Sequence, residues 1–212
     1  MKEEIRKEIK EKRMKQSEEE NRKKSKKIKE KLFALKEYKK AETILFYISY
    51  DGEVFTHDMI HESFYKKNIV VPVSNKDNFT LTLSHLKNLE ELSIGNYNIL
   101  EPRVEKIRKT NIKDIDLLIV PGVAFDTKCN RMGHGKGYYD RLLENVKIPI
   151  IGLAFEFQII DEIPVEKHDK PIDIIITEKR LIKCFNHRWF LYIKFYDMYS
   201  LYPFIKNILL KY

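Results

Sequence analysis

The chain has 212 residues, a length typical of one domain with or without appendages. Hydrophobic residues make up 43% of it, which suffices for a buried core and excludes a wholly disordered protein. The net charge of +8 comes from residues 1–40, which hold 17 Lys/Arg and 9 Asp/Glu, because the rest of the chain holds 23 of each. This segment could attract a polyanion or a charged small substrate. We favour a solvated helical surface, because its Lys and Glu residues interleave as helix-supporting pairs.

The cysteine content and the hydropathy indicate in which cellular compartment the protein functions. Neither Cys129 nor Cys184 belongs to a CxxC or zinc-binding pattern, so we interpret both as free thiols in a reducing compartment. No signal peptide precedes the charged start, and no uncharged apolar run approaches the ~18–20 residues of a membrane span. We therefore expect a cytoplasmic protein that has no membrane partner.

The basic segment at the start of the chain is predicted to be helical. Ile5 and Ile9 are four residues apart within 2–14, which is the spacing of one helical face. Ser17 and Glu20 fit a capping box and predict the start of a second helix. The apolar stripe of this second helix consists of Ile28, Leu32, Leu35 and Tyr38.

From residue 43 onward, short apolar runs alternate with helical patterns. Strands are expected at 43–49, 69–73, 79–83, 114–122, 148–155 and 171–177, and helices at 56–67 and 138–146. Residues 84–111 are expected to be mostly loop, with Gly95 and Pro102 as breakers. The alternation predicts an α/β fold with three layers, α/β/α, around a mostly parallel central sheet.

The last segment, 184–212, has a different composition, since it holds ten of the chain's 25 Phe, Tyr and Trp residues. Lys194, Asp197 and Lys206 interrupt it, which argues against a transmembrane helix. We favour packing onto the domain or a partner chain, with an interfacial membrane helix as the alternative. The chain is thus divided into a domain at 1–183, which includes the basic helices, and a C-terminal extension at 184–212.

A glycine-rich cluster, RMGHGKGYYDR at 131–141, follows an expected buried strand that ends at Pro121-Gly122. In open parallel sheets, ligands gather at the carboxyl ends of strands, and the helix expected after the cluster offers unpaired N–H groups. Glycines let the backbone approach an anion closely, and Arg131 and Lys136 would add charge-assisted hydrogen bonds. These features predict a phosphate-binding loop, although a tight structural turn explains the glycines about equally well.

The spacing of the cluster excludes two common nucleotide motifs. GxxxxGK[ST] is absent, and the dinucleotide fingerprint would need glycine at position 138, which is Tyr. Asp140 would repel a bound phosphate unless a cation lies between them, and Mg²⁺ is the natural candidate. Alternatively, Asp140 simply complements the helix dipole. Asp169 and Asp173 precede the expected strand at 171–177, and either could reach the same edge of the sheet.

Several blocks of this sequence resemble the 5-formyltetrahydrofolate cyclo-ligases, also called methenyltetrahydrofolate synthetases. The blocks are PGVAFD, RMGHGKGYYDR and IPVEKHDKPIDIIITE, with KEEIRKEIKEKR and YISYDGEVFT before them in the same order. The resemblance covers about residues 2–180 and implies the three-layer fold grouped with sugar-phosphate isomerases and CoA transferases. It also implies conversion of 5-formyltetrahydrofolate to 5,10-methenyltetrahydrofolate, with Mg²⁺ as cofactor and ATP as co-substrate, releasing ADP and phosphate.

The resemblance further implies roles for individual residues. Nucleotide contacts fall on Lys2, Arg6, Arg131, Met132, Gly133, His134, Gly135, Lys136, Gly137, Tyr138 and Tyr139. Folate contacts fall on Ile48, Glu53, His134, Gly135, Lys136, Gly137 and Tyr138. The magnesium ligands fall on Asp140 and Asp169, which favours Asp169 over Asp173. Lys136 and Arg131 are expected to be catalytic, since they would stabilise charge on a phosphoryl group transferred to the formyl oxygen.

The chain departs from the family at Cys129 and Asn130, where a small or Gly-containing turn is common, and in the extra length beyond about residue 183. An alternative function is a catalytically idle relative that binds nucleotide or RNA through the basic helices. The joint retention of Lys136, Asp140, Asp169 and Glu53 weighs against it. We expect small-molecule substrates, no nucleic-acid partner, and a monomer or weak homo-oligomer.

Overall fold

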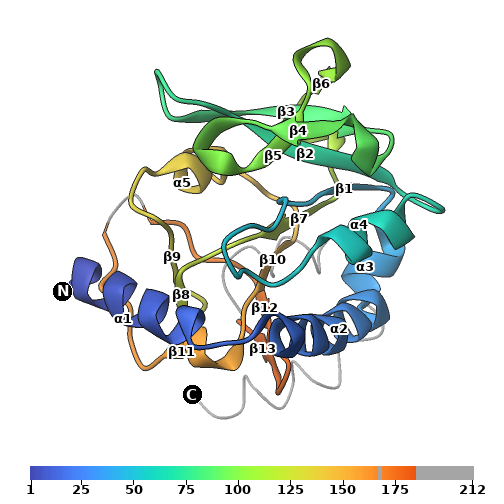
Figure 1. The fold of residues 1–212 in the computed structure, drawn as a ribbon. Coiled ribbons are helices and arrows are strands. Elements are labelled where there is room, and N and C mark those ends of the chain that lie inside the picture. The colour runs from blue at the N-terminus through green and yellow to red at the C-terminus, as the bar shows by residue number, and fades with distance from the viewer. Residues whose placement is uncertain (167–168, 185–212) are drawn as a thin grey trace, which may run out of the picture.

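The computed structural model describes residues 1–166 and 169–184. In this part of the chain, an eight-stranded sheet has the order β13-β12-β10-β7-β1-β2-β3-β6 (Figure 1). The parallel strands are β12 (Ile174–Ile176), β10 (Ile150–Leu153), β7 (Leu117–Val120), β1 (Thr43–Leu45) and β2 (Asn68–Asn75). Antiparallel strands extend the two edges: β13 (Leu181–Lys183), β3 (Thr80–Leu86) and β6 (Lys109–Thr110). The predicted α/β fold with a mostly parallel central sheet is confirmed.

Alternate residues along each strand point to opposite faces of the sheet, so the sheet has two hydrophobic cores. Ile119 and Ile151 face α2 (Glu18–Ala34), α3 (Lys36–Lys40) and α4 (His57–Ser63), which lie together on one side in Figure 1. Leu118 and Ile150 face the other side, where Leu143 and Val146 follow the short helix α5 (Tyr138–Leu142). This second outer layer contains more irregular chain than the prediction implied.

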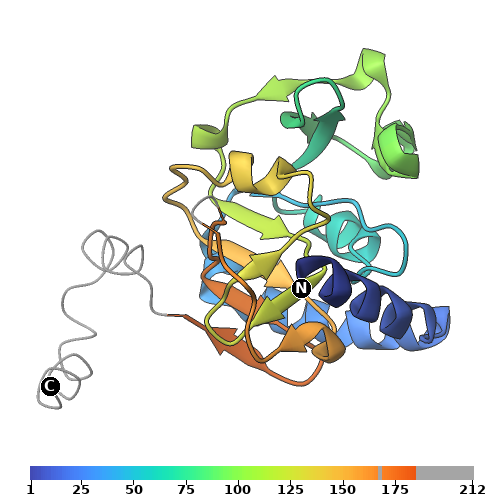
Figure 2. The same cartoon turned by 90° about the vertical axis from the view of Figure 1, so that its left-hand side faces the viewer.

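The helices of the basic segment form where the sequence predicts them. Helix α1 (Lys2–Met14) lies beside a small sheet of strand order β11 (Ile159–Ile160), β8 (Ala124–Asp126) and β9 (Arg131–Met132) (Figure 2). Ile9 of this helix is buried in a cluster with Ala124 and Met132. The Ser17 hydroxyl caps α2 by accepting a hydrogen bond from the Glu20 amide at 3.1 Å. Ile28, Leu32 and Tyr38 are buried, but the chain turns to extended backbone at Leu35 and divides the expected stripe between α2 and α3.

The structure differs from the prediction mainly in very short elements. Residues 84–111 contain β4 (Leu92–Ile94) and β5 (Leu100–Pro102), with 3₁₀ helices at Leu89–Glu91, Asn96–Asn98 and Val104–Lys106. Further 3₁₀ helices lie at Ile112–Asp114 and Glu156–Gln158. The strands β8 (Ala124–Asp126), β9 (Arg131–Met132) and β11 (Ile159–Ile160) were not predicted. Elements of two or three residues are too short to show a hydrophobic period, so the sequence pattern cannot indicate them.

The prediction of two free thiols was wrong, because Cys129 and Cys184 form a disulfide. The two residues are 55 apart in sequence, but both pair with the chain that enters β12. Ile172 donates its amide to the Cys129 carbonyl at 3.0 Å, and Cys184 donates its amide to the Asp173 carbonyl at 3.0 Å. The pairing of β13 with β12 therefore brings the cysteines together, and the absence of a CxxC motif excluded only a local pair.

We expect the disulfide to be present in protein purified without reductant. Under denaturing conditions, a thiol reagent should detect no free thiol before reduction and two per chain after it. Because the bond closes a long loop, Cys184→Ser should destabilise the fold by about 2–4 kcal/mol and lower the melting temperature by several degrees. The measurement is thermal unfolding of both proteins without reductant. Equal melting temperatures would show that the bond does not constrain the unfolded chain.

No helix within residues 1–166 and 169–184 has the length and apolarity required to cross a membrane. The expectations for the C-terminal extension, including its packing and its alternative interfacial helix, concern residues 185–212 and lie outside the described residues.

Candidate active site

A cavity of about 280 Å³ opens at the carboxyl ends of three adjacent parallel strands, as expected for an open α/β sheet. Pro121 and Gly122 follow β7, and Ile48 follows β1. Pro72 and Ser74 belong to the second half of β2. The glycine cluster, which runs from β9 into α5, lines the cavity as well.

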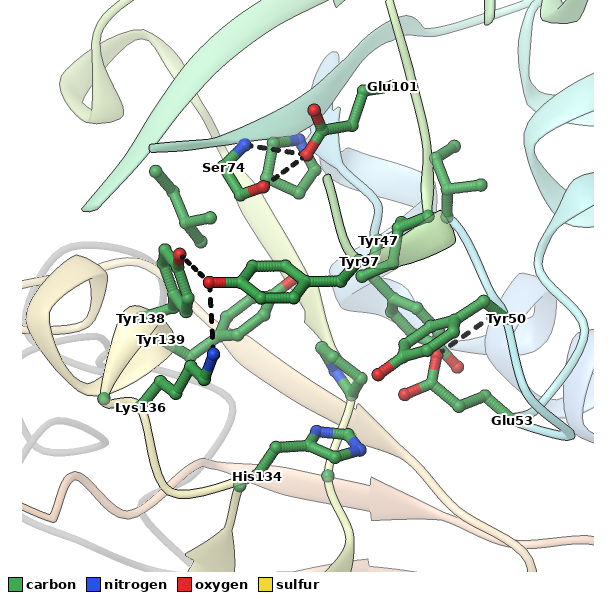
Figure 3. A pocket seen from close by; sticks show the side chains of 18 of the residues that line it. Tyr47, Tyr50, Glu53, Ser74, Tyr97, Glu101, His134, Lys136, Tyr138 and Tyr139 are labelled. Atoms are coloured by element: carbon green, nitrogen blue, oxygen red, sulfur yellow. Dashed lines mark hydrogen bonds between the residues drawn. The ribbon is translucent and has the colours of Figure 1, made fainter. Parts of the chain in front are cut away.

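The structure brings most of the predicted site residues into this one cavity. Those lining it are Ile48, Glu53, Arg131, Gly133, His134, Lys136, Gly137, Tyr138, Tyr139 and Asp140. Figure 3 shows Lys136 and Glu53 reaching into it from opposite sides. Outside the lining are Lys2, Arg6, Met132, Gly135 and Asp169. The last group includes three charged residues that the structure gathers beside the glycine cluster.

Helix α1 brings these charged residues to the glycine cluster. Arg6 donates from Nε to the Gly133 carbonyl at 3.0 Å. Lys2, one turn earlier, places its Nζ 2.8 Å from Asp169 Oδ2 and 2.9 Å from Glu166 Oε1. The start of the chain and the segment that leads to β12 are thus joined by ion pairs near the cluster.

Two glycines of the cluster adopt a backbone conformation that side chains disfavour. Gly135 has φ +93° and Gly137 has φ +70°, both in the left-handed region. A Cβ atom at Gly135 would also lie 3.4 Å from the Arg6 guanidinium. These glycines therefore serve the turn itself.

Lys136 is held by aromatic residues on its side of the cavity. Its Nζ donates to the Tyr97 hydroxyl at 3.2 Å and lies 4.3 Å from the centre of the Tyr97 ring (Figure 3). The Tyr97 and Tyr138 hydroxyls are 3.2 Å apart, and Tyr138 donates to the Asn75 carbonyl at 3.1 Å. The hydrogen bonds with Tyr138 and Lys136 lower the pKa of Tyr97. This network orients the lysine ammonium toward the cavity.

Tyr97 was missed by the sequence reasoning, which treated its segment as loop. It has φ 59° within the turn that connects β4 to β5. Glu101, which is 7% exposed, holds this turn against β2, because its Oε1 accepts from the Ser74 amide at 2.9 Å and the Ser74 hydroxyl at 2.6 Å. Gly95 lets the turn approach Glu101, since a Cβ there would lie 2.5 Å from Glu101 Oε2, but no pattern in the sequence indicates this contact.

Glu53 is a buried carboxylate with an unpaired oxygen. Its side chain is 7% exposed, and Oε2 accepts a long hydrogen bond of 3.4 Å from the Tyr50 amide. Oε1 has no hydrogen-bond partner, although it is buried. Burial raises the pKa of Glu53 to about 7. A buried acceptor without a partner is costly, so the cavity contains a group suited to a ligand that donates hydrogen bonds.

His134 enters the cavity near Tyr50, with ring centroids 6.1 Å apart. Burial, together with the charges of Arg13 and Arg131, lowers its pKa to about 4. The imidazole is therefore neutral at neutral pH, so it can donate from one ring nitrogen and accept at the other.

Asp140 has a cationic neighbour within the protein. Arg131, which is 4% exposed, donates from Nη2 to Asp140 Oδ1 at 2.7 Å, and its guanidinium lies 5.5 Å from the Tyr139 ring centroid. Among residues 1–166 and 169–184, no three His, Cys, Asp or Glu side chains cluster as a metal cage would. The carboxylate oxygens of Asp140 and Asp169 still fit Mg²⁺, which binds through one or two carboxylates plus phosphate oxygens.

The sequence and the fold match known proteins. The sequence profile of the 5-formyltetrahydrofolate cyclo-ligase family matches residues 1–178. A 5-formyltetrahydrofolate cyclo-ligase from Haemophilus influenzae is 34% identical over 148 residues, which cover 66% of this chain and 78% of that protein.

Two solved structures extend the match to the fold. The 5,10-methenyltetrahydrofolate synthetase of Aquifex aeolicus is 35% identical, with a TM-score of 0.77 over 87% of this chain and 93% of that one. The 5,10-methenyltetrahydrofolate synthetase of Mycoplasma pneumoniae is 28% identical, with a TM-score of 0.69 over 84% and 98%. With the family profile, the relatives and the fold in agreement, the chain belongs to the 5-formyltetrahydrofolate cyclo-ligase family and is a ligase of that family.

Proposed function

We propose that this ligase uses ATP and Mg²⁺ to convert 5-formyltetrahydrofolate to 5,10-methenyltetrahydrofolate, with release of ADP and phosphate. The observation that carries the proposal is the placement of Lys136 and the unpaired Glu53 carboxylate in one cavity at the carboxyl ends of the parallel strands. One group suits a phosphoryl anion, and the other suits the N–H donors of a pterin ring.

In this proposal, the pterin end of the folate lies against Glu53. A pterin offers a ring N–H and an exocyclic amino group, and the free Oε1 of Glu53 can accept from them. The rings of Tyr47, Tyr50 and Tyr139 and the side chain of Ile48 supply apolar walls for a flat heterocycle. Neutral His134 adds a further polar contact without adding charge.

ATP is proposed to bind along the glycine cluster, on the side where α1 is docked. Lys2 and Arg6 contribute positive charge there, and the cluster from Met132 to Tyr139 contributes backbone N–H groups that glycines leave accessible. Asp140 and Asp169 would hold Mg²⁺, which when bound neutralises charge on phosphate oxygens. Arg131 would keep Asp140 in place through their ion pair.

The proposed chemistry overcomes the low reactivity of a formyl amide. The formyl oxygen attacks the γ-phosphorus of ATP, the bond to ADP breaks, and the oxygen becomes a phosphate leaving group. N10 of the folate then bonds to the activated carbon and loses its proton, and the C–O bond to phosphate breaks. The protein contributes mainly by aligning both substrates and by neutralising charge, as in other phosphoryl transfers. Lys136 would face the transferred phosphoryl group, with Arg131 behind it.

The test is a direct assay. We expect protein mixed with 5-formyltetrahydrofolate, ATP and Mg²⁺ to increase the ultraviolet absorbance of the methenyl product, and to fail when ATP or Mg²⁺ is omitted. An active cyclo-ligase assayed in parallel is the positive control. No product at high enzyme concentration would refute the proposal. Salt-sensitive RNA binding without turnover would support the idle relative instead. The cytoplasmic location and the monomeric or weakly oligomeric state stay predictions.

A further inference from the structure

Arg13 lies in the last turn of α1, at the turn that carries Glu53. It is 8% exposed, and its Nη1 donates to the Asp51 carbonyl at 3.4 Å. Gly52 has φ +71°, and a Cβ there would lie 3.1 Å from Arg13 Cγ, so the arginine stem packs directly on the glycine backbone. The family resemblance assigned no role to this arginine.

The guanidinium of Arg13 and the carboxylate of Glu53 are both incompletely paired. Nε and Nη2 of Arg13 are buried without a hydrogen-bond partner, and so is Oε1 of Glu53. Nε and Nη2 form the edge of a guanidinium that binds a carboxylate through two parallel hydrogen bonds. Buried, unpaired groups of opposite charge lie beside the same turn, yet they do not bond to each other. Leaving these groups unpaired lowers the stability of the fold, and such a cost is typical of residues that serve a ligand.

We infer that Arg13 is a positioning residue for the folate: its charge favours the carboxylate form of Glu53, and its packing fixes the turn, while Oε1 stays unpaired within the protein. The inference rests on the proposed function, in which Glu53 holds the pterin. A direct bidentate ion pair would occupy the carboxylate oxygens that the ligand needs. A cation held close by, without that bond, stabilises the anion and leaves its acceptor oxygen unpaired.

The charged and titratable groups around Glu53 identify Arg13 as the group that offsets burial most. Burial raises the Glu53 pKa, the positive charge of Arg13 lowers it, the Tyr50 amide lowers it, and Asp51 in the same turn raises it. Tyr47 and Tyr50 beside β1 and Tyr139 from α5 face Glu53 as neutral phenols, because burial raises the pKa of each. His134 from the glycine cluster is neutral as well.

The experiment measures equilibrium binding of 5-formyltetrahydrofolate, without ATP, between pH 6 and 9. Wild-type affinity should rise as Glu53 deprotonates, with a midpoint near pH 7. Arg13→Met should move this midpoint upward by about one pH unit, weakening binding about fivefold at pH 7 and hardly at all at pH 9. Arg13→Lys, which keeps the charge, should retain a midpoint close to that of the wild type. Asp51→Asn should move it downward.

Two controls separate a specific effect from a structural one. Lys10→Met removes an exposed cation of the same helix, three residues away, and should leave the midpoint unchanged. In a Glu53→Gln background, Arg13→Met should cause no further loss. A loss that is equal at every pH, or that persists in that background, would overturn the inference. If Arg13→Met does not fold, Arg13→Lys provides the test. A midpoint for Arg13→Lys that moves upward by about one pH unit, as expected for a neutral residue, would also overturn the inference. If the single variant Glu53→Gln binds with the wild-type affinity and the wild-type pH dependence, the proposed role of Glu53 is refuted instead.

Discussion

Replacing Lys136 with alanine is expected to lower kcat by about 10²–10³, the scale of losing a main electrostatic stabiliser of a transition state. The ammonium lies in the cavity, held by the Tyr97 hydroxyl and ring, where it can stabilise charge that develops during phosphoryl transfer. The KM for 5-formyltetrahydrofolate should change much less, because the proposed pterin contacts lie on the Glu53 side. The measurement is the steady-state rate of formation of the methenyl product at saturating ATP.

Lys113→Ala is the matched control, since this lysine is exposed, lies in the 3₁₀ helix Ile112–Asp114 and does not line the cavity. It should retain full activity. Circular dichroism of both variants tests that folding is preserved. A Lys136→Ala enzyme with an unimpaired kcat would remove the lysine from the mechanism, whereas an equal loss in both variants would point to general damage.

Replacing Glu53 with glutamine is expected to weaken 5-formyltetrahydrofolate binding at least tenfold at pH 8 and to abolish the rise in affinity near pH 7. An amide oxygen is a weaker acceptor than a carboxylate, and the amide nitrogen would present a donor to the pterin donors. Equilibrium binding without ATP isolates this effect from catalysis. Asp161→Asn, at an exposed acidic residue outside the cavity, is a charge-matched control that should bind normally.

The same substitution should stabilise the empty protein at alkaline pH. The pKa of Glu53 is raised from 4.5 to about 7, so between these values the native state binds more protons than the unfolded state. Stability therefore falls as the pH rises through this window, and the loss persists above it. Glutamine does not titrate, so Glu53→Gln should gain about 1–3 kcal/mol at pH 8 and little near pH 4.5. Thermal unfolding at both pH values measures the difference. A gain independent of pH would contradict the ionisation of a buried Glu53.

These two expectations for Glu53 describe a trade of stability for function. A buried, unpaired carboxylate destabilises the ligand-free fold, and the same unpaired oxygen gives the proposed pterin site its polarity. The Arg13 guanidinium limits this cost without consuming the oxygen. A substitution at this position can therefore stabilise the protein, but it is expected to weaken ligand binding.

Local patterns in the sequence predicted the elements that are long enough to show a period. The four-residue spacing of Ile5 and Ile9 predicted α1, and Ser17 with Glu20 predicted the start of α2. Apolar runs predicted the parallel strands, although β1 ends at Leu45 rather than at residue 49. The chain after residue 45 leaves the sheet to form the wall of the cavity, and its apolar residues are buried there instead. A buried strand and a buried cavity wall therefore both produce a run of apolar residues, and the sequence does not distinguish them.

The candidate site was predictable to the extent that its residues are contiguous. The cluster at 131–141 was identifiable from glycines beside charged residues, whereas Glu53 was identified only through the resemblance of several blocks to one family. Their meeting in one cavity followed from the rule that ligands bind at the carboxyl ends of parallel strands. Tyr97 and Glu101 were not identifiable, because a single aromatic or acidic residue in an irregular segment carries no pattern.

The sequence by itself determined the α/β class, the helices at the start of the chain, the position of the glycine cluster and the family. Those features depend on neighbours within a few residues or on blocks of contiguous residues. Only the tertiary structure decided that Tyr97 holds Lys136, that Arg13 lies beside Glu53, and that Cys129 bonds to Cys184. These pairs are far apart in the sequence, and their contacts depend on strand order and helix docking, which leave no periodic trace in the residues between them.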